Sequence, residues 1–188
     1  MVAIHPSDCR NFQGEIPLSV PDITIPTQFL TFHLAKEVFA IEISKIKEVL
    51  EYTSLTKIPR TPDFMCGVIN LRGSVVPVVD LRIKFGMPKA DRTVNTCIII
   101  IDVIQGETST IIGAMADSVK EVMELDPSQI DPPPKIGTGM RTEYMRGMGK
   151  QGNHFVLLLD TDRVFSLEEL NALKNAGTAA SRLHEEAA

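Results

Sequence analysis

The stretch Ile58–Arg82 reads IPRTPDFMCGVINLRGSVVPVVDLR and contains the clearest structural signal in the chain. Its centre holds two short apolar runs, Val68–Leu71 and Ser74–Val79, separated only by Arg72 and Gly73. Glycine supplies the permissive backbone that a tight hairpin turn needs. We therefore predict two antiparallel strands that meet at Arg72-Gly73.

Short strands of the same kind flank this hairpin on both sides. Ile, Val and Leu predominate in them, and Gly, Pro, Asn or Asp separate them. The predicted strands are 29–34, 38–43, 47–52, 68–71, 74–79, 96–102, 108–116, 119–124 and 154–159, with a four-residue hairpin loop at 104–107. Strands this short, with such frequent breaks, indicate a barrel or sandwich rather than a parallel α/β sheet.

The sequence also contains an internal repeat. Residues 46–50 (IKEVL) match residues 119–123 (VKEVM), and an apolar strand precedes each copy. Further on, Ile58-Pro59 is echoed by Ile130-Asp131-Pro132, and 73–85 resembles 152–165 in the spacing of Gly, Asp and Phe. Correspondences in the same order predict two versions of one β-unit, although short apolar strands also resemble one another by chance. Halves of this size need to pack together to form a core.

The two ends differ from the body. Residues 1–26 contain four prolines and no periodic pattern, which predicts an extended arm. Ser166 and Glu169 form a capping-box pattern, and Leu167, Leu170 and Leu173 follow at helical spacing. We predict a C-terminal helix whose Ala-rich tail frays after Gly177.

Composition narrows the functional classes. A net charge of −5 disfavours nucleic-acid binding, which needs clustered Lys and Arg. Cys9, Cys66 and Cys97 stand far apart without a CxxC pair, which is typical of reduced thiols. No apolar run is long enough to span a bilayer, and the N-terminus lacks a signal-peptide pattern. The prediction is a cytoplasmic protein.

Motifs that carry chemistry are few. Residues 147–152 spell GxGxxG, but a dinucleotide site needs this motif between a strand and a helix, and here it precedes a strand-like run. A flexible loop is the better interpretation. Asp80 and Asp160 end apolar strands and resemble helix N-caps. The four histidines share no metal-ligand spacing. We predict no catalytic residue, no metal site and no cofactor.

The stretch Ile58–Arg82 closely resembles the signature of the CheW-like family, in which an Ile-Pro step and a turn precede G-V-x-N-L-R-G-x-x-x-P-x-x-D-L-R. Residues 38–43, 46–49 and 116–119 match as well, so the resemblance covers about Gln28 to Leu170. It implies an all-β fold: two five-stranded SH3-like β-barrel subdomains around a shared hydrophobic core, with a C-terminal helix. The implied organisation is an arm at 1–26, a CheW-like domain at 27–170, and a helix and tail at 171–188.

The resemblance also implies a function. The chain looks like a chemotaxis adaptor that couples methyl-accepting receptors to the histidine kinase CheA by protein–protein contact. The implied partners are the cytoplasmic tips of the receptors and the regulatory domain of CheA, without nucleic acid or membrane insertion. In the family, receptor tips dock in a groove between the barrels, and the related kinase domain meets the end of one barrel.

Five residues carry the implied partner-binding site. Glu48 and Arg72 lie close together in similar proteins and affect partner binding, either as a direct contact or as a structural ion pair. Ile46 is a candidate apolar anchor. Asn70 and Gly73 shape the turn that presents Arg72, whereas Gly67 and Pro77 are backbone requirements.

Two other interpretations stay open. One is a CheW-like scaffold of another motility or developmental signalling pathway. The other is an enzyme built on small β-barrels, which would bring Asp80, Asp102 and His154 together around a ligand or metal.

Overall fold

The computed structural model describes residues 25–133, 142–152 and 154–185, and it consists mainly of two β-sheets. The predicted arm, except for Ile25 and Pro26, lies outside the described residues. We call the sheets barrel A and barrel B. Barrel A contains β1 (Thr27–Leu34), β2 (Glu37–Glu42), β8 (Ser118–Leu125), β9 (Ile130–Asp131), β10 (Met145–Gln151) and β11 (His154–Leu159). Barrel B contains β3 (Ile46–Glu51), β4 (Met65–Leu71), β5 (Ser74–Asp80), β6 (Cys97–Gln105) and β7 (Thr108–Ala116).

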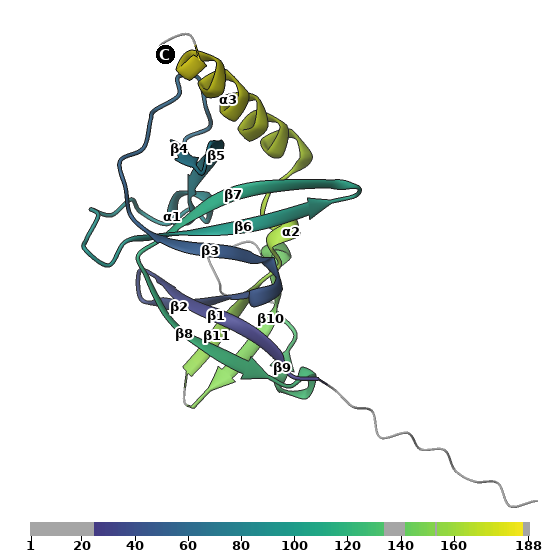
Figure 1. The fold of residues 1–188 in the computed structure, drawn as a ribbon. Coiled ribbons are helices and arrows are strands. Elements are labelled where there is room, and N and C mark those ends of the chain that lie inside the picture. The colour runs from purple at the N-terminus through teal and green to yellow at the C-terminus, as the bar shows by residue number, and fades with distance from the viewer. Residues whose placement is uncertain (1–24, 134–141, 153, 186–188) are drawn as a thin grey trace, which may run out of the picture.

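In the part of the chain that the structure describes, six short or terminal helices connect and cover the strands. They are the 3-10 turns η1 (Ile43–Lys45), η2 (Pro127–Gln129) and η3 (Thr142–Tyr144), and the helices α1 (Leu81–Lys84), α2 (Thr161–Val164) and α3 (Leu167–Glu185). In Figure 1, barrel B occupies the upper half of the view, barrel A the lower half, and α3 lies beside β4 and β5. Among the described residues, the structure contains no helix with the length and hydropathy needed to cross a membrane.

Both sheets follow the same strand order, which confirms the internal repeat. In barrel A the order is β8-β1-β2-β11-β10, with β2 and β11 parallel; in barrel B it is β3-β6-β7-β5-β4, with β7 and β5 parallel. The remaining pairs are antiparallel. Each barrel therefore takes strands from both halves of the sequence.

Each sheet closes on itself through the segment that follows its first edge strand. In barrel A this segment is β9, which continues from β8 and pairs with β10. In barrel B, Thr56 follows β3 and exchanges two backbone hydrogen bonds with Val68 of β4, at 2.9 and 3.0 Å. The prediction of two barrels is confirmed, but barrel A has a sixth strand because its closing segment pairs over two residues.

The apolar core follows from the barrels. In β6, Ile98 and Ile100 belong to one buried cluster, whereas Ile99 and Ile101 belong to another. Alternation along the strand sends these two pairs to opposite faces. The cluster that contains Ile98 and Ile100 fills barrel B, and an equivalent cluster around Phe29 and Val156 fills barrel A. The largest cluster contains residues of both barrels and of α3, and it is the shared core that the resemblance implied.

Local signals predicted several details correctly. Asp80 accepts hydrogen bonds from the N–H groups of Arg82 and Ile83, and Asp160 accepts one from Asp162, so both aspartates are N-caps. The capping box of α3 is formed, because Ser166 N–H donates to Glu169 and Glu169 N–H donates to the Ser166 hydroxyl.

Other details differ from the prediction. The GxGxxG segment is not a loop but forms most of β10 and the turn at Gly152. The hairpin between β6 and β7 turns tightly at 106–107, not over four residues. Helix α3 starts after Ser166, as the capping box predicted, but it continues through Gly177 to Glu185 where fraying was expected. Packing explains the last difference, because Ala176 and Ala180 are buried in the shared core.

Candidate partner-binding site

The ion pair between Glu48 and Arg72 forms as the resemblance implied. Arg72 Nη2 lies 3.0 Å from Glu48 Oε2 and joins the β4–β5 turn to the edge strand β3. The Arg72 side chain is 81% exposed and that of Glu48 is 25% exposed. An exposed guanidinium held by a more buried carboxylate can still reach a partner.

The turn that carries Arg72 is constrained by its sequence. Arg72 and Gly73 have φ values of 51° and 87°, which a two-residue hairpin of type I′ requires at both positions. The Asn70 side-chain oxygen accepts a hydrogen bond from Gly73 N–H at 2.9 Å. Asn70 and Gly73 therefore shape this turn, as predicted.

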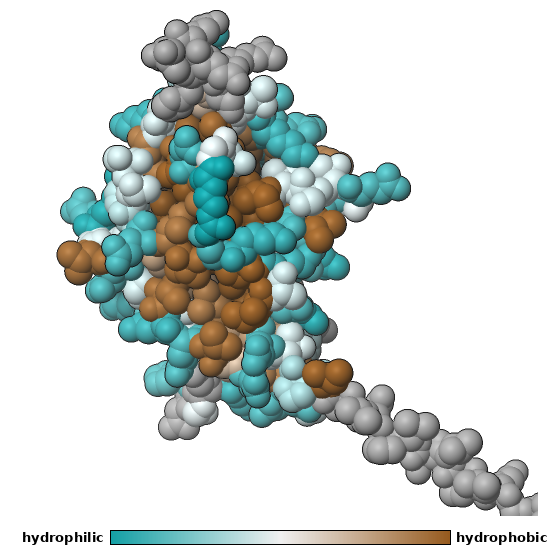
Figure 2. Space-filling model, in the orientation of Figure 1, coloured by the Kyte–Doolittle hydropathy of each residue, from teal (hydrophilic) through white to brown (hydrophobic). Residues whose placement is uncertain are grey.

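Ile46 opens β3 beside the junction of the barrels. It is half-buried and packs against the shared core, as do Ile43 before it and Val119 on β8. Val49 on β3 and Val122 on β8 are 42% and 50% exposed. We call Ile43, Ile46, Val49, Val119 and Val122 the apolar strip. Both strands cross the face shown in Figure 1, and Figure 2 shows apolar surface gathered in the middle of that face.

Sequence reasoning named Ile46 but missed Val49 and Val122. The repeat contained the signal, because residues 46–50 and 119–123 place a valine at the same position of two edge strands. Exposed apolar residues on edge strands are typical of a protein–protein interface.

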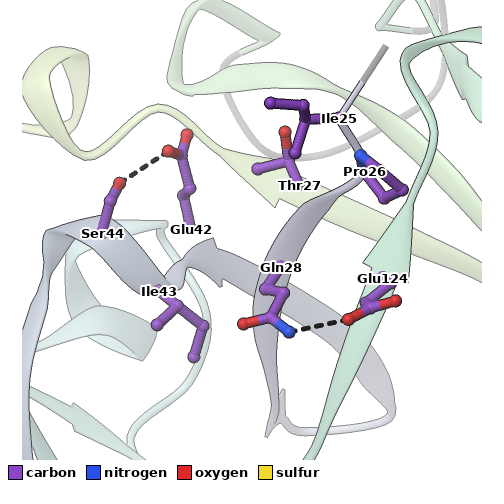
Figure 3. Close-up of a pocket in the computed structure, with 8 residues that line it drawn as sticks. All are labelled: Ile25, Pro26, Thr27, Gln28, Glu42, Ile43, Ser44 and Glu124. Atoms are coloured by element: carbon purple, nitrogen blue, oxygen red, sulfur yellow. Dashed lines mark hydrogen bonds between the residues drawn. The ribbon is translucent and has the colours of Figure 1, made fainter. Parts of the chain in front are cut away.

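A pocket of about 600 Å³ adjoins the apolar strip at Ile43. Figure 3 shows its lining, which comes from the start of β1 and the two residues before it, the end of β2, the η1 turn and the end of β8. Gln28 Nε2 donates to Glu124 at 2.7 Å, and Ser44 Oγ donates to Glu42 at 2.6 Å across from it. Both carboxylates therefore already have partners, and Glu42 also pairs with Arg146.

The residues of the enzyme interpretation have separate surroundings. Asp80 caps α1, whereas Asp102 pairs with Lys47 at 3.1 Å. The hydrogen bond from Ser109 and the contact with Lys47 lower the pKa of Asp102. His154 is exposed at the start of β11. Within the described residues, no group of His, Cys, Asp and Glu is arranged to hold a metal ion.

The two thiols in the described part of the chain are partly or fully buried. Burial raises the pKa of Cys66 and of Cys97, and nearby carboxylates add to the effect. A thiol attacks as its thiolate, so a raised pKa lowers its reactivity at neutral pH.

Comparisons with known proteins agree with this geometry. The profile of the CheW-like domain family matches residues 28–169. A chemotaxis protein CheW of Klebsiella aerogenes is 36% identical over 152 residues, which cover 81% of this chain and 89% of the relative. The protein FrzA of Myxococcus xanthus is 30% identical over 64% of this chain and 72% of its own length.

A solved structure shows the same fold. The scaffolding protein TtCheW from Thermoanaerobacter tengcongensis superposes with a TM-score of 0.69 and 32% sequence identity, over 77% of this chain and 91% of that one. The family profile spans most of the chain, and sequence and fold agree. The chain therefore belongs to the CheW-like domain family.

Proposed function

We propose that this chain is a chemotaxis adaptor that couples methyl-accepting receptors to the histidine kinase CheA. The observation that carries the proposal is the apolar strip together with the Glu48–Arg72 pair, whose carboxylate lies on the same edge strand β3, in a family of chemotaxis scaffolds. An adaptor works by contact, so it needs separate surfaces for two partners and no reacting group.

We propose that the apolar strip receives an α-helix from the cytoplasmic tip of a receptor. A helix in a groove binds through apolar side chains spaced along one face. The apolar strip offers such a surface, because Ile46 and Val119 are half-buried against the shared core and Val49 and Val122 are about half exposed. The regulatory domain of CheA, which has a related fold, then contacts the end of one barrel.

Replacing Val49 or Val122 by aspartate is expected to reduce receptor binding at least tenfold while leaving the chain folded. Each side chain is about half exposed, so a charge there stays hydrated in the free protein but is desolvated under a docked helix. Binding of a receptor cytoplasmic fragment can be measured by titration calorimetry. Val94→Asp is the matched control, because Val94 is 99% exposed in the loop between α1 and β6. Equal binding by all three variants would remove the strip from the receptor site.

The Glu48–Arg72 pair is expected to act on binding more than on stability. A pair with one exposed member contributes only about 0–1 kcal/mol to folding. Arg72→Ala and Glu48→Ala should therefore unfold near the wild-type urea concentration but bind CheA or the receptor fragment more weakly. The exchange Glu48→Arg with Arg72→Glu separates a structural role of the pair from a direct contact with the partner. It keeps an ion pair between the two positions but reverses the charge that each presents. Full binding by the exchanged protein would mean that the pair is structural only.

The pathway is tested by reconstitution. Adding the chain to receptor-containing membranes and CheA should raise kinase autophosphorylation and make it sensitive to receptor ligand. A chain that binds neither CheA nor a chemoreceptor fragment would instead be a scaffold of another signalling pathway.

A further inference from the structure

The two halves of the chain exchange strands. The first half, residues 27–85, supplies β1 and β2 to barrel A but β3, β4 and β5 to barrel B. The second half, residues 97–165, supplies the remaining strands of both barrels. Every barrel is therefore an interface between the halves, and the halves must recognise each other.

One ion pair joins the halves beside α1. Arg82 stands two residues after the N-cap Asp80, and its Nη1 lies 2.9 Å from Asp117 Oδ2. Asp117 belongs to the link between β7 and β8, where the second half crosses from barrel B to barrel A. The same carboxylate oxygen accepts a hydrogen bond from Ala35 N–H at 2.7 Å.

A second ion pair occupies the corresponding place beside α2. Asp162 stands two residues after the N-cap Asp160, and its Oδ2 lies 2.6 Å from Lys45 Nζ. Lys45 belongs to η1, where the first half crosses from barrel A to barrel B. Asp162 Oδ1 accepts a hydrogen bond from Ile104 N–H at 2.7 Å. The two arrangements are alike, but their charges are reversed.

In these two contacts the charges are sorted by half, whereas the pair of Glu42 with Arg146 joins the halves in the opposite sense. The first half carries both cations, Lys45 and Arg82, and the second half carries both anions, Asp117 and Asp162. We propose that these four charges specify which half pairs with which. Two first halves from different copies would place Arg82 against Lys45, and two second halves would place Asp162 against Asp117. Like charges at such partly buried contacts repel, so each half accepts only the complementary half, from its own chain or from a second copy.

Double variants of the full chain with the same net charge test this proposal. Arg82→Asp with Asp117→Arg reverses one pair but keeps opposite charges in contact, as does Lys45→Asp with Asp162→Lys. Arg82→Asp with Asp162→Arg places two anions at the contact of residues 82 and 117 and two cations at the contact of residues 45 and 162. Each half then carries one cation and one anion, so a half could pair with the same half of a second copy. Thermal unfolding and mass by light scattering are the measurements.

We expect the first two variants to keep the wild-type mass and to melt below wild type by a few degrees, because each loses the carboxylate that accepts one backbone N–H, from Ala35 or from Ile104. The third should melt roughly 5 °C or more below them, or should form dimers and larger species by pairing like halves. The fourfold variant Lys45→Asp, Arg82→Asp, Asp117→Arg and Asp162→Arg restores opposite charges at both contacts, so it should recover the wild-type mass and melt above the third variant. Failure of this recovery, or equal behaviour of the three double variants, would overturn the proposal, because the cost would then come from single residues and not from pairing.

A cross-link reports the pairing directly. Glu51 of the first half and Cys97 of the second are Cα partners across β3 and β6. In a background with Cys9→Ser and Cys66→Ser, oxidation of Glu51→Cys should link these positions within one chain. The link should persist when the charge pairs are reversed in place and fall at least severalfold in Arg82→Asp with Asp162→Arg. Equal yields would contradict the proposal.

Discussion

Gly67→Ala is expected to be the most destabilising single methyl addition to this chain. A Cβ at Gly67 would lie 2.4 Å from the carbonyl oxygen of Thr56, and Gly67 has a φ of 144°. The oxygen belongs to the backbone segment that closes barrel B, so it cannot move without opening the barrel. Overpacking costs about 1–3 kcal/mol and the backbone conformation about as much again, so we expect a loss of about 3 kcal/mol or more.

Alanine substitutions at two other glycines are the comparison, with the free energy of unfolding measured in urea. Gly147 is the repeat equivalent in barrel A, and a Cβ there would meet Asp131 O at 2.8 Å, so Gly147→Ala should destabilise less than Gly67→Ala. Gly177 lies in α3, and its nearest neighbour would be Val75 O at 3.6 Å. Since alanine favours a helix by about 1 kcal/mol over glycine, Gly177→Ala should be neutral or stabilising. Equal midpoints for the Gly67 and Gly177 variants would refute the closure argument.

Glu169→Ala is expected to have the second large effect. Glu169 Oε1 lies 2.5 Å from Lys84 Nζ, and the Lys84 side chain is only 6% exposed. The ammonium lies 4.8, 5.3 and 5.6 Å from the ring centroids of Phe64, Phe165 and Tyr144. Removing the carboxylate leaves a buried cation with aromatic faces alone, and breaking such a pair costs about 3 kcal/mol.

The same pair has an apolar replacement. Lys84→Met with Glu169→Gln keeps the length of both side chains and the capping role of residue 169, so it should unfold close to wild type. The order of stability should be wild type, then Lys84→Met, then Glu169→Ala, as measured by urea unfolding followed by circular dichroism. A Glu169→Ala protein as stable as Lys84→Met would mean that the ammonium finds water when its partner is removed.

Acid should lower the stability of the folded protein by protonating the Glu169 carboxylate. Burial alone would raise the pKa of Glu169, but hydrogen bonds from Lys84 and Ser166 outweigh it and hold the pKa below 4.5. A folded pKa below the unfolded one gives stability that is present above about pH 4.5 and is lost as the pH falls through the folded value. Between pH 5 and 3, wild type should therefore lose stability more steeply than Glu169→Gln. Parallel curves would show that other carboxylates dominate.

Much of the fold could be predicted because local signals and the repeat agree. Alternating β-branched residues gave the strands around Arg72-Gly73, and the aspartates after β5 and β11 are the N-caps expected from their type. Strand β10 could not be predicted in this way. Its glycines suggest a loop, but Cβ atoms at 147 and 149 would meet Ile130 Cγ2 at 2.6 Å and Leu125 Cδ1 at 2.5 Å. These glycines are set by tertiary contacts, not by strand propensity.

The candidate partner-binding site also has a part that could be predicted from the sequence and a part that could not. The contact between Glu48 and Arg72 and the turn at Asn70 followed from the family resemblance, and the structure places them together. The exposure of Val49 and Val122 could not be read from sequence, because an apolar residue in a strand is usually buried. It depends on β3 and β8 being edge strands of different barrels, which is a property of the whole topology.

The exchanged strands also determine how the native state opens. Neither barrel can lose the strands of one half without the other barrel losing strands as well, so no small cooperative unit coincides with a barrel. Amide hydrogens in β1 and in β6 should then exchange with solvent deuterium at one common free energy, and calorimetric and van't Hoff enthalpies should coincide.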